Sequence, residues 1–69
     1  MVERFKTRLK AHRLDRGLTQ ADLAVMAQVS RKTINTIENG VFIPSAQLAL
    51  RLAGILNLAV EDLFYLEVE

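Results

Sequence analysis

The 69-residue sequence predicts an all-α fold of five short helices and admits a short β-ribbon formed by its two ends. Two observations predict this fold. Apolar residues recur at spacings of three and four, as they do on the buried side of a helix. Hydroxyl and amide residues, the glycines and the single proline fall between these apolar stretches, where helices begin and end. We therefore expect one domain over residues 1–69.

The first two helices are marked by their end residues. The first is expected over residues 8–16, with Thr7 placed to cap its start and Gly17 able to end it in the left-handed conformation. The second begins at Thr19. A hydroxyl at Thr19 with a carboxylate three residues on, at Asp22, is the pattern of a capping box.

The third helix is expected from a cap at Ser30 to the pair Asn39-Gly40, which is typical of a helix end. Ile34 and Ile37 are three residues apart and fall on one side of this helix. That side is expected to face the core, which leaves the polar side chains on the opposite face.

The fourth helix is expected to start at Ser45, to bury Leu48, Leu52 and Ile55, and to end at Asn57. A short fifth helix is expected over residues 60–64. Residues 65–69 alternate as a strand does, and residues 2–5 could pair with them.

Composition excludes several classes of function. There is no Cys, which excludes disulfides and thiolate metal sites, and His12 alone cannot build a metal site. The Ser residues occupy predicted helix caps and the acidic residues are scattered, so we expect no enzyme activity and no cofactor. No apolar run approaches the roughly 20 residues of a membrane span, and the first residues do not resemble a signal peptide. We expect a cytoplasmic protein without a membrane or small-molecule partner.

Charge is divided unevenly along the chain. Residues 1–40 hold eight basic and four acidic groups, a net of +4, and residues 41–69 hold one basic and four acidic groups, a net of −3. A chain polarised in this way can turn a basic face toward a polyanion.

The spacing of the second and third helices carries the functional prediction. About three residues, Gln28-Val29-Ser30, separate them, and small Ala24 allows a steep crossing. This is the spacing of a helix-turn-helix over residues 19–39, which holds the third helix out as a rigid rod. Its exposed face offers groups that suit phosphates and base edges in the major groove of DNA: Arg31, Lys32, Asn35 and Thr36.

The ordered set Leu18-Thr19-Gln20-Ala21-Asp22-Leu23-Ala24, Val29 to Gly40, and Pro44-Ser45 resembles the Cro-like phage-repressor family of helix-turn-helix regulators, over about residues 8–64. The resemblance implies the five-helix λ-repressor-like fold, with residues 31–39 as a recognition helix in the major groove. It also implies a sequence-specific regulator of transcription that binds double-stranded DNA, and we expect it to be a repressor.

Carried over residue by residue, the resemblance implies that Gln20 binds a phosphate and that Asn39 lies along the DNA backbone. It also implies that four residues of the third helix face bases or nearby phosphates: Arg31, Lys32, Asn35 and Thr36. Apart from the resemblance, the free backbone N–H groups at the start of this helix, at Ser30, can bind a phosphate. It further implies a structural ion pair between Arg13 and Glu38, for which the plain alternative is an ordinary surface pair worth about 0–1 kcal/mol.

Two positions depart from the family pattern. Gln28 stands where the family often has Gly, so we expect a mildly strained left-handed residue that costs roughly 1 kcal/mol. His12 stands where an aliphatic residue is usual, and we expect it to be half-buried.

A homodimer is expected because a core of this size gives only about 3–5 kcal/mol of stability. The interface is assigned to apolar residues that one small core was not expected to cover: Ile55, Leu58, Leu63, Phe64 and Tyr65. Such a dimer would read a palindromic operator. The alternative function is an antitoxin that binds a toxin and its own operator. We would expect an extra tail to wrap the toxin, and none follows Glu69.

Overall fold

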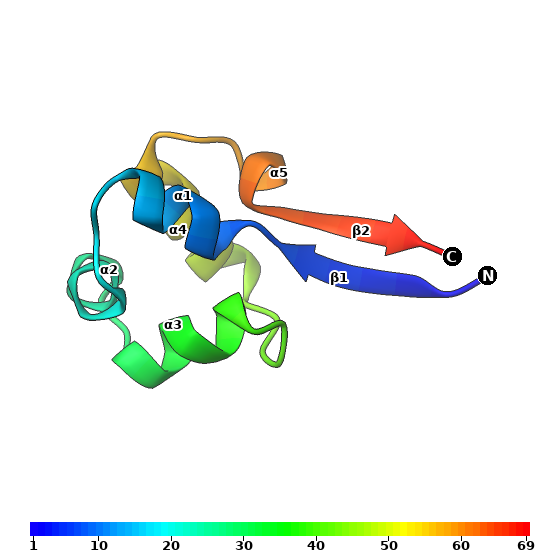
Figure 1. Ribbon diagram of the computed structural model, residues 1–69, viewed down its shortest axis with the longest axis horizontal. Helices are drawn as coiled ribbons and strands as arrows, with labels where there is room; N and C mark the ends of the chain where they lie inside the picture. The colour runs from blue at the N-terminus through cyan, green and yellow to red at the C-terminus, as the bar shows by residue number, and fades with distance from the viewer.

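The computed structural model describes all residues, 1–69, and contains five helices with a two-stranded antiparallel sheet, as expected. The elements in chain order are β1 (Glu3–Thr7), α1 (Leu9–Asp15), α2 (Gln20–Ala27), α3 (Arg31–Glu38), α4 (Ala46–Leu56), α5 (Val60–Leu63) and β2 (Phe64–Val68). The helices form one body, and β1 and β2 project from it as a ribbon that carries both chain ends (Figure 1). None of the helices is long and apolar enough to cross a membrane.

Every helix contributes to one aliphatic core. The fully buried large side chains, at least one from each helix, are Leu9, Leu23, Ile34, Ile37, Leu52, Leu56 and Leu63. Because protein interiors are close-packed, such a core fixes the helices relative to one another. The position of α3 is therefore set by its neighbours rather than by its own short length.

The predicted starts of α2, α3 and α4 are confirmed. The hydroxyl oxygens of Thr19, Ser30 and Ser45 accept hydrogen bonds from the backbone N–H three residues on, at 2.9, 3.1 and 3.1 Å. The N–H of Thr19 also donates to Oδ2 of Asp22 at 2.9 Å, which completes the capping box. At the other end of α4, Asn57 adopts the left-handed conformation, with φ 57°.

The first helix begins one residue later and the last helix ends one residue earlier than expected, and at both places the sheet is the reason. Thr7 pairs with Phe64, so both residues are extended and belong to strands. Arg8 occupies the N-cap position of α1, although Oγ1 of Thr7 still accepts a hydrogen bond from the N–H of Leu9 at 3.1 Å.

The ribbon is anchored to the body at its inner end. The rings of Phe5 and Phe64 stack with their centroids 5.5 Å apart, and the guanidinium of Arg8 lies 4.0 Å from the ring centre of Tyr65. At the outer end, Val2 and Glu69 exchange two backbone hydrogen bonds of 3.1 and 2.8 Å. Pairing thus runs along the whole ribbon.

The apolar residues near the C-terminus were expected to remain uncovered in a single subunit, and this is wrong at two positions. Leu63 is fully buried and Phe64 is only 7% exposed, both within a single subunit. Both belong to the single core cluster, and the ring of Phe5 stacks on Phe64, so one small core does reach this far. Ile55, Leu58 and Tyr65 are half-buried, and His12 is half-buried as expected.

Candidate nucleic-acid interface

The turn between α2 and α3 is held from both sides. Gln28 adopts the left-handed conformation predicted for it, with φ 60° and ψ 40°. The N–H of Val29 donates to the carbonyl of Ala24 at 3.0 Å, and Nη1 of Arg51 on α4 donates to the carbonyl of Ala27 at 3.0 Å. These bonds satisfy the carbonyls at the end of α2 and fix the direction in which α3 leaves.

Helix α3 has one apolar and one polar side. Ile34 and Ile37 are fully buried, whereas Arg31, Lys32 and Asn35 are exposed. Arg31, Asn35 and Asn39 recur every four residues and therefore lie one above the other along the helix. The exposed side thus combines positive charge with amide groups, the chemistry that suits phosphates and base edges.

Two hydroxyls predicted at this surface are engaged by the protein itself. Oγ of Ser30 caps α3 by accepting from the N–H of Thr33, and it lies 2.9 Å from Oγ1 of Thr33. Thr36 is half-buried, and its hydroxyl donates to the carbonyl of Thr33 at 3.0 Å. Both residues therefore contribute to the shape of α3 before any contact with a partner.

Arg13 and Glu38 form the ion pair that the resemblance implied, and it is not an ordinary surface pair. Nε and Nη2 of Arg13 donate to the two carboxylate oxygens of Glu38 at 2.6 and 3.1 Å. The side chains are only 7% and 2% exposed. The hydrogen bond to Glu38 raises the pKa of Arg13 above its already high ordinary value. The pair ties α1 to the end of α3.

Gln20 takes part in a contact that the sequence did not indicate. As the first residue of α2, it reaches across to α3, where its side-chain nitrogen donates to Oδ1 of Asn35 at 3.1 Å and to Oε1 of Glu38 at 3.2 Å. Both hydrogens of this amide are thereby used inside the protein. A phosphate at the start of α2 would meet the backbone N–H groups there, because the first turn of a helix leaves them without intrahelical partners.

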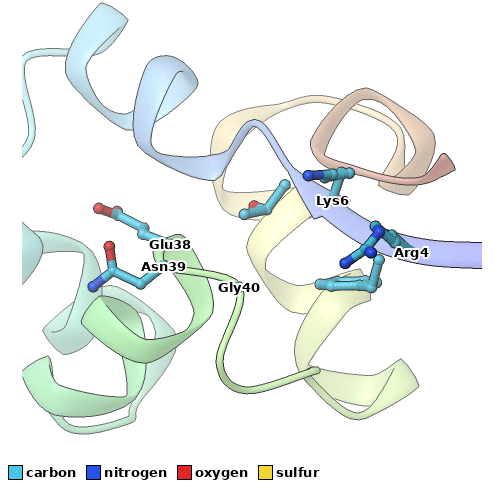
Figure 2. A pocket seen from close by; sticks show the side chains of 7 residues that line it. Arg4, Lys6, Glu38, Asn39 and Gly40 are labelled. Carbon is cyan, nitrogen blue, oxygen red and sulfur yellow. The ribbon is translucent and has the colours of Figure 1, made fainter.

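A pocket of about 340 Å³ lies beside the end of α3 (Figure 2). β1 lines one side with Arg4 and Lys6, and the end of α3 lines the other with Glu38, Asn39 and Gly40. The sequence did not indicate that these two cations lie near Asn39, because the two segments are more than 30 residues apart. Lys6 thus lies beside the end of α3, and Arg4 lies there as a cation that is paired with Glu69 at 3.0 Å.

Comparisons with known proteins agree with this architecture. The family model described as helix-turn-helix matches residues 9–63. The chain is 44% identical over 63 residues to an HTH-type transcriptional regulator, MJ0272, of Methanocaldococcus jannaschii, which covers 91% of this chain and 96% of that protein. It is 36% identical over 65 residues to the HTH-type transcriptional regulator YgzD of Bacillus subtilis, covering 94% of this chain and 98% of that protein.

A solved structure has the same fold. The clp gene regulator ClgR of Corynebacterium glutamicum superposes with a TM-score of 0.74 at 30% sequence identity, and the match covers 78% of this chain. This chain spans 57% of the length of the ClgR chain, so the likeness concerns a part of that regulator. The family match over most of the chain, together with relatives at this level of identity, establishes that the chain belongs to the helix-turn-helix family of transcriptional regulators.

Proposed function

We propose that this protein is a homodimeric transcriptional repressor that binds double-stranded DNA with α3 in the major groove. The observation that carries the proposal is the exposed side of α3. Arg31, Lys32 and Asn35 project from a helix that is fixed on its other side by two fully buried isoleucines and by Glu38. A rigid, polar and positively charged helix of this width suits the major groove, which admits one α-helix.

The interface divides into groups that read bases and groups that hold phosphates. Asn35 carries no charge and is assigned to a base, whereas Lys32 and Arg31 can serve either partner. The N–H groups at the starts of α2 and α3, Asn39, and the cations on β1 are assigned to the phosphates that flank the groove.

The dimer contact is assigned to the outer part of the ribbon. Leu66 and Val68 lie on the same face as Phe5 and Phe64, because their positions in the two strands alternate with that of Tyr65. They are 57% and 55% exposed, so apolar side chains continue past the core into solvent on this face, where Glu3 lies opposite Val68. Ile55 and Leu58 are half-buried and can add to a contact with a second copy, whereas Tyr65 lies on the other face of the ribbon, against Arg8.

Symmetry then predicts the form of the DNA site. A dimer displays two copies of α3 related by a two-fold axis, so the operator should be palindromic, with half-sites about one helical turn, roughly 34 Å, apart. The repressor role follows from occlusion: a dimer bound over a promoter excludes other proteins from it. A reporter gene under the selected operator should be less active when the protein is present.

The test is a selection of binding sites from random duplexes, followed by titrations on matched and scrambled duplexes at several salt concentrations. Asn35→Ala should relax base preference by roughly 1–3 kcal/mol and leave the salt slope unchanged. Lys32→Ala should lower the slope by about one unit per subunit if it contacts a phosphate. The matched control is Gln47→Ala, an exposed amide on α4. If Asn35→Ala binds both duplexes as the wild type does, α3 is not the reading helix.

A further inference from the structure

The side-chain amide of Asn35 is polarised by its neighbours before any DNA is bound. Its Oδ1 accepts two hydrogen bonds, one from Nε2 of Gln20 at 3.1 Å and one from Nδ2 of Asn39 at 3.3 Å. A carbonyl oxygen has two lone pairs, so this acceptor is saturated. Its Nδ2 donates to no group of the protein. Because the residue is exposed, this NH₂ group is free to donate to a partner.

This orientation follows from the ion pair behind it. The carboxylate of Glu38 is paired with Arg13 and can only accept hydrogen bonds. Gln20 must therefore turn its NH₂ group toward Glu38, and that same NH₂ group also meets Asn35. Asn35 must therefore accept this hydrogen bond with its side-chain oxygen, Oδ1. The buried ion pair thus determines, through Gln20, which end of the Asn35 amide faces outward from α3.

We infer that Gln20 is a positioning residue that determines specificity, because it fixes Asn35 as a reader that only donates hydrogen bonds. This inference rests on the proposed function and deepens it. With its oxygen occupied, Asn35 offers two N–H donors and no acceptor to the major groove. The paired contact with N6 and N7 of adenine, which requires a donor and an acceptor together, is closed to it.

Guanine is the base that fits this arrangement. It presents two acceptors in the major groove, N7 and O6, which can take the two hydrogens of one NH₂ group. Thymine offers a single acceptor, O4. Adenine also has one acceptor, N7, but its neighbouring amino group would face the second hydrogen of Asn35, and cytosine presents only an amino group. The base pair opposite Asn35 should therefore present guanine first and thymine second.

The free protein offers a first test that needs no variant. In NMR spectra, both side-chain amide hydrogens of Gln20 should exchange slowly with solvent, because both are hydrogen-bonded. Both hydrogens of Asn35 should exchange quickly. The reverse pattern, with protected Asn35 hydrogens and unprotected Gln20 hydrogens, would overturn the inference.

The second test measures base preference at one position. The position read by Asn35 is the one at which Asn35→Ala flattens the preference of the wild type. There, replacing guanine by 7-deazaguanine, which lacks the N7 acceptor, should weaken binding by about tenfold. Asn35→Asp keeps the acceptor for Gln20 and removes the outward donors, so it should lose the preference for guanine.

Variants of Gln20 test the positioning role directly. Gln20→Met removes the amide and frees Asn35 to rotate, so discrimination between guanine and adenine should fall by about tenfold at that position alone. Gln20→Glu presents an acceptor that can turn the NH₂ of Asn35 inward, so the preference should move toward adenine or cytosine. Gln47→Met on α4 is the matched control and should change no preference.

The outcomes distinguish a failure of the positioning role of Gln20 from a failure of DNA binding itself. A wild-type preference for adenine at this position, or an unchanged preference in a folded Gln20→Met variant, would overturn the inference while leaving DNA binding intact. Equal binding of the wild type to selected and scrambled duplexes would overturn the proposed function and the inference together.

Discussion

Arg13 and Glu38 lie 25 positions apart in the chain and bind each other through two hydrogen bonds, with only 7% and 2% of their side chains exposed. Arg13 also donates to the carbonyl of Leu18 at 2.8 Å, so one guanidinium joins α1, the segment before α2 and the end of α3. Removing either partner leaves a buried charge without compensation.

The first prediction concerns stability. Arg13→Ala should lower the free energy of unfolding by about 3–5 kcal/mol, the usual cost of breaking a buried ion pair. The control is Arg4→Ala, which breaks the exposed pair of Arg4 with Glu69, whose side chains are 56% and 52% exposed, and should cost at most about 1 kcal/mol. Urea denaturation measures the control, and circular dichroism without urea should show Arg13→Ala largely unfolded, because its loss equals the roughly 3–5 kcal/mol that a core of this size provides. Equal effects in the two variants would mean that the buried pair is no more important than a surface one.

The second prediction concerns the turn. Gln28→Gly should be neutral or stabilising by up to about 1 kcal/mol, because Gly adopts the left-handed conformation without strain. Gly40→Ala is the opposite change, since φ at Gly40 is 73°, and it should destabilise by about 1 kcal/mol. A clear loss of stability in Gln28→Gly would indicate side-chain contacts of Gln28 beyond its backbone role.

The third prediction concerns acid. The hydrogen bond from the N–H of Thr19 lowers the pKa of Asp22 below its ordinary value of 3.8. The folded state thus binds this proton less readily than the unfolded state, and the capping box stabilises the fold fully only above that ordinary value. The stabilisation should disappear as the pH falls below 3.8 through the lower pKa of the folded state.

The measurement is the urea midpoint of the wild type and of Asp22→Asn as a function of pH. The difference between them should be largest at neutral pH and should shrink in acid. Asp15→Asn, which removes an exposed carboxylate near the end of α1, controls for the loss of a charge. A difference that stays constant down to pH 2 would contradict a role for the Asp22 carboxylate.

The fourth prediction concerns assembly. Leu66→Glu should convert the proposed dimer to a monomer, because it places a charge on the apolar face of the ribbon. Leu14→Glu is a closely matched control, since Leu14 on α1 is also 57% exposed. Sedimentation at micromolar concentration should show a monomer for Leu66→Glu and a dimer for the wild type and Leu14→Glu. A monomeric wild type would contradict the homodimer itself.

The fifth prediction concerns the two cations on β1. The double variant Arg4→Gln, Lys6→Gln should reduce the salt dependence of DNA binding by about two units per subunit if both contact phosphates. Base preference should not change, because phosphates carry no sequence information. An unchanged salt slope would place the pocket beside Asn39 outside the DNA interface.

Local chemistry made much of the fold predictable. The hydroxyls of Thr19, Ser30 and Ser45 cap helices wherever they precede an apolar repeat, and the left-handed residues Gln28 and Asn57 follow from what a helix end requires. The error at Thr7 has a tertiary cause. A threonine before a helix is a good cap, and only its pairing with a residue 57 positions away makes it a strand residue.

The candidate site was predictable in its residue types and not in its connections. The exposed face of α3 follows from the spacing of Ile34 and Ile37. The bonds from Gln20 to Asn35 and Glu38 depend on the distance between two helices, which no local pattern encodes. The burial of Phe64 likewise depends on Phe5, at the other end of the chain.

The ribbon also sets an order on folding during synthesis. β1 leaves the ribosome before the helices, and its partner β2 leaves after them. Until then, β1 has no strand to pair with, and the stacked partner of Phe5 is missing. The helical body can assemble from contacts that are closer in sequence, whereas the ribbon depends on a loop closure that spans the whole chain. Any surface built on the ribbon, including the proposed contact between subunits, therefore becomes available only after the helical body has been synthesised.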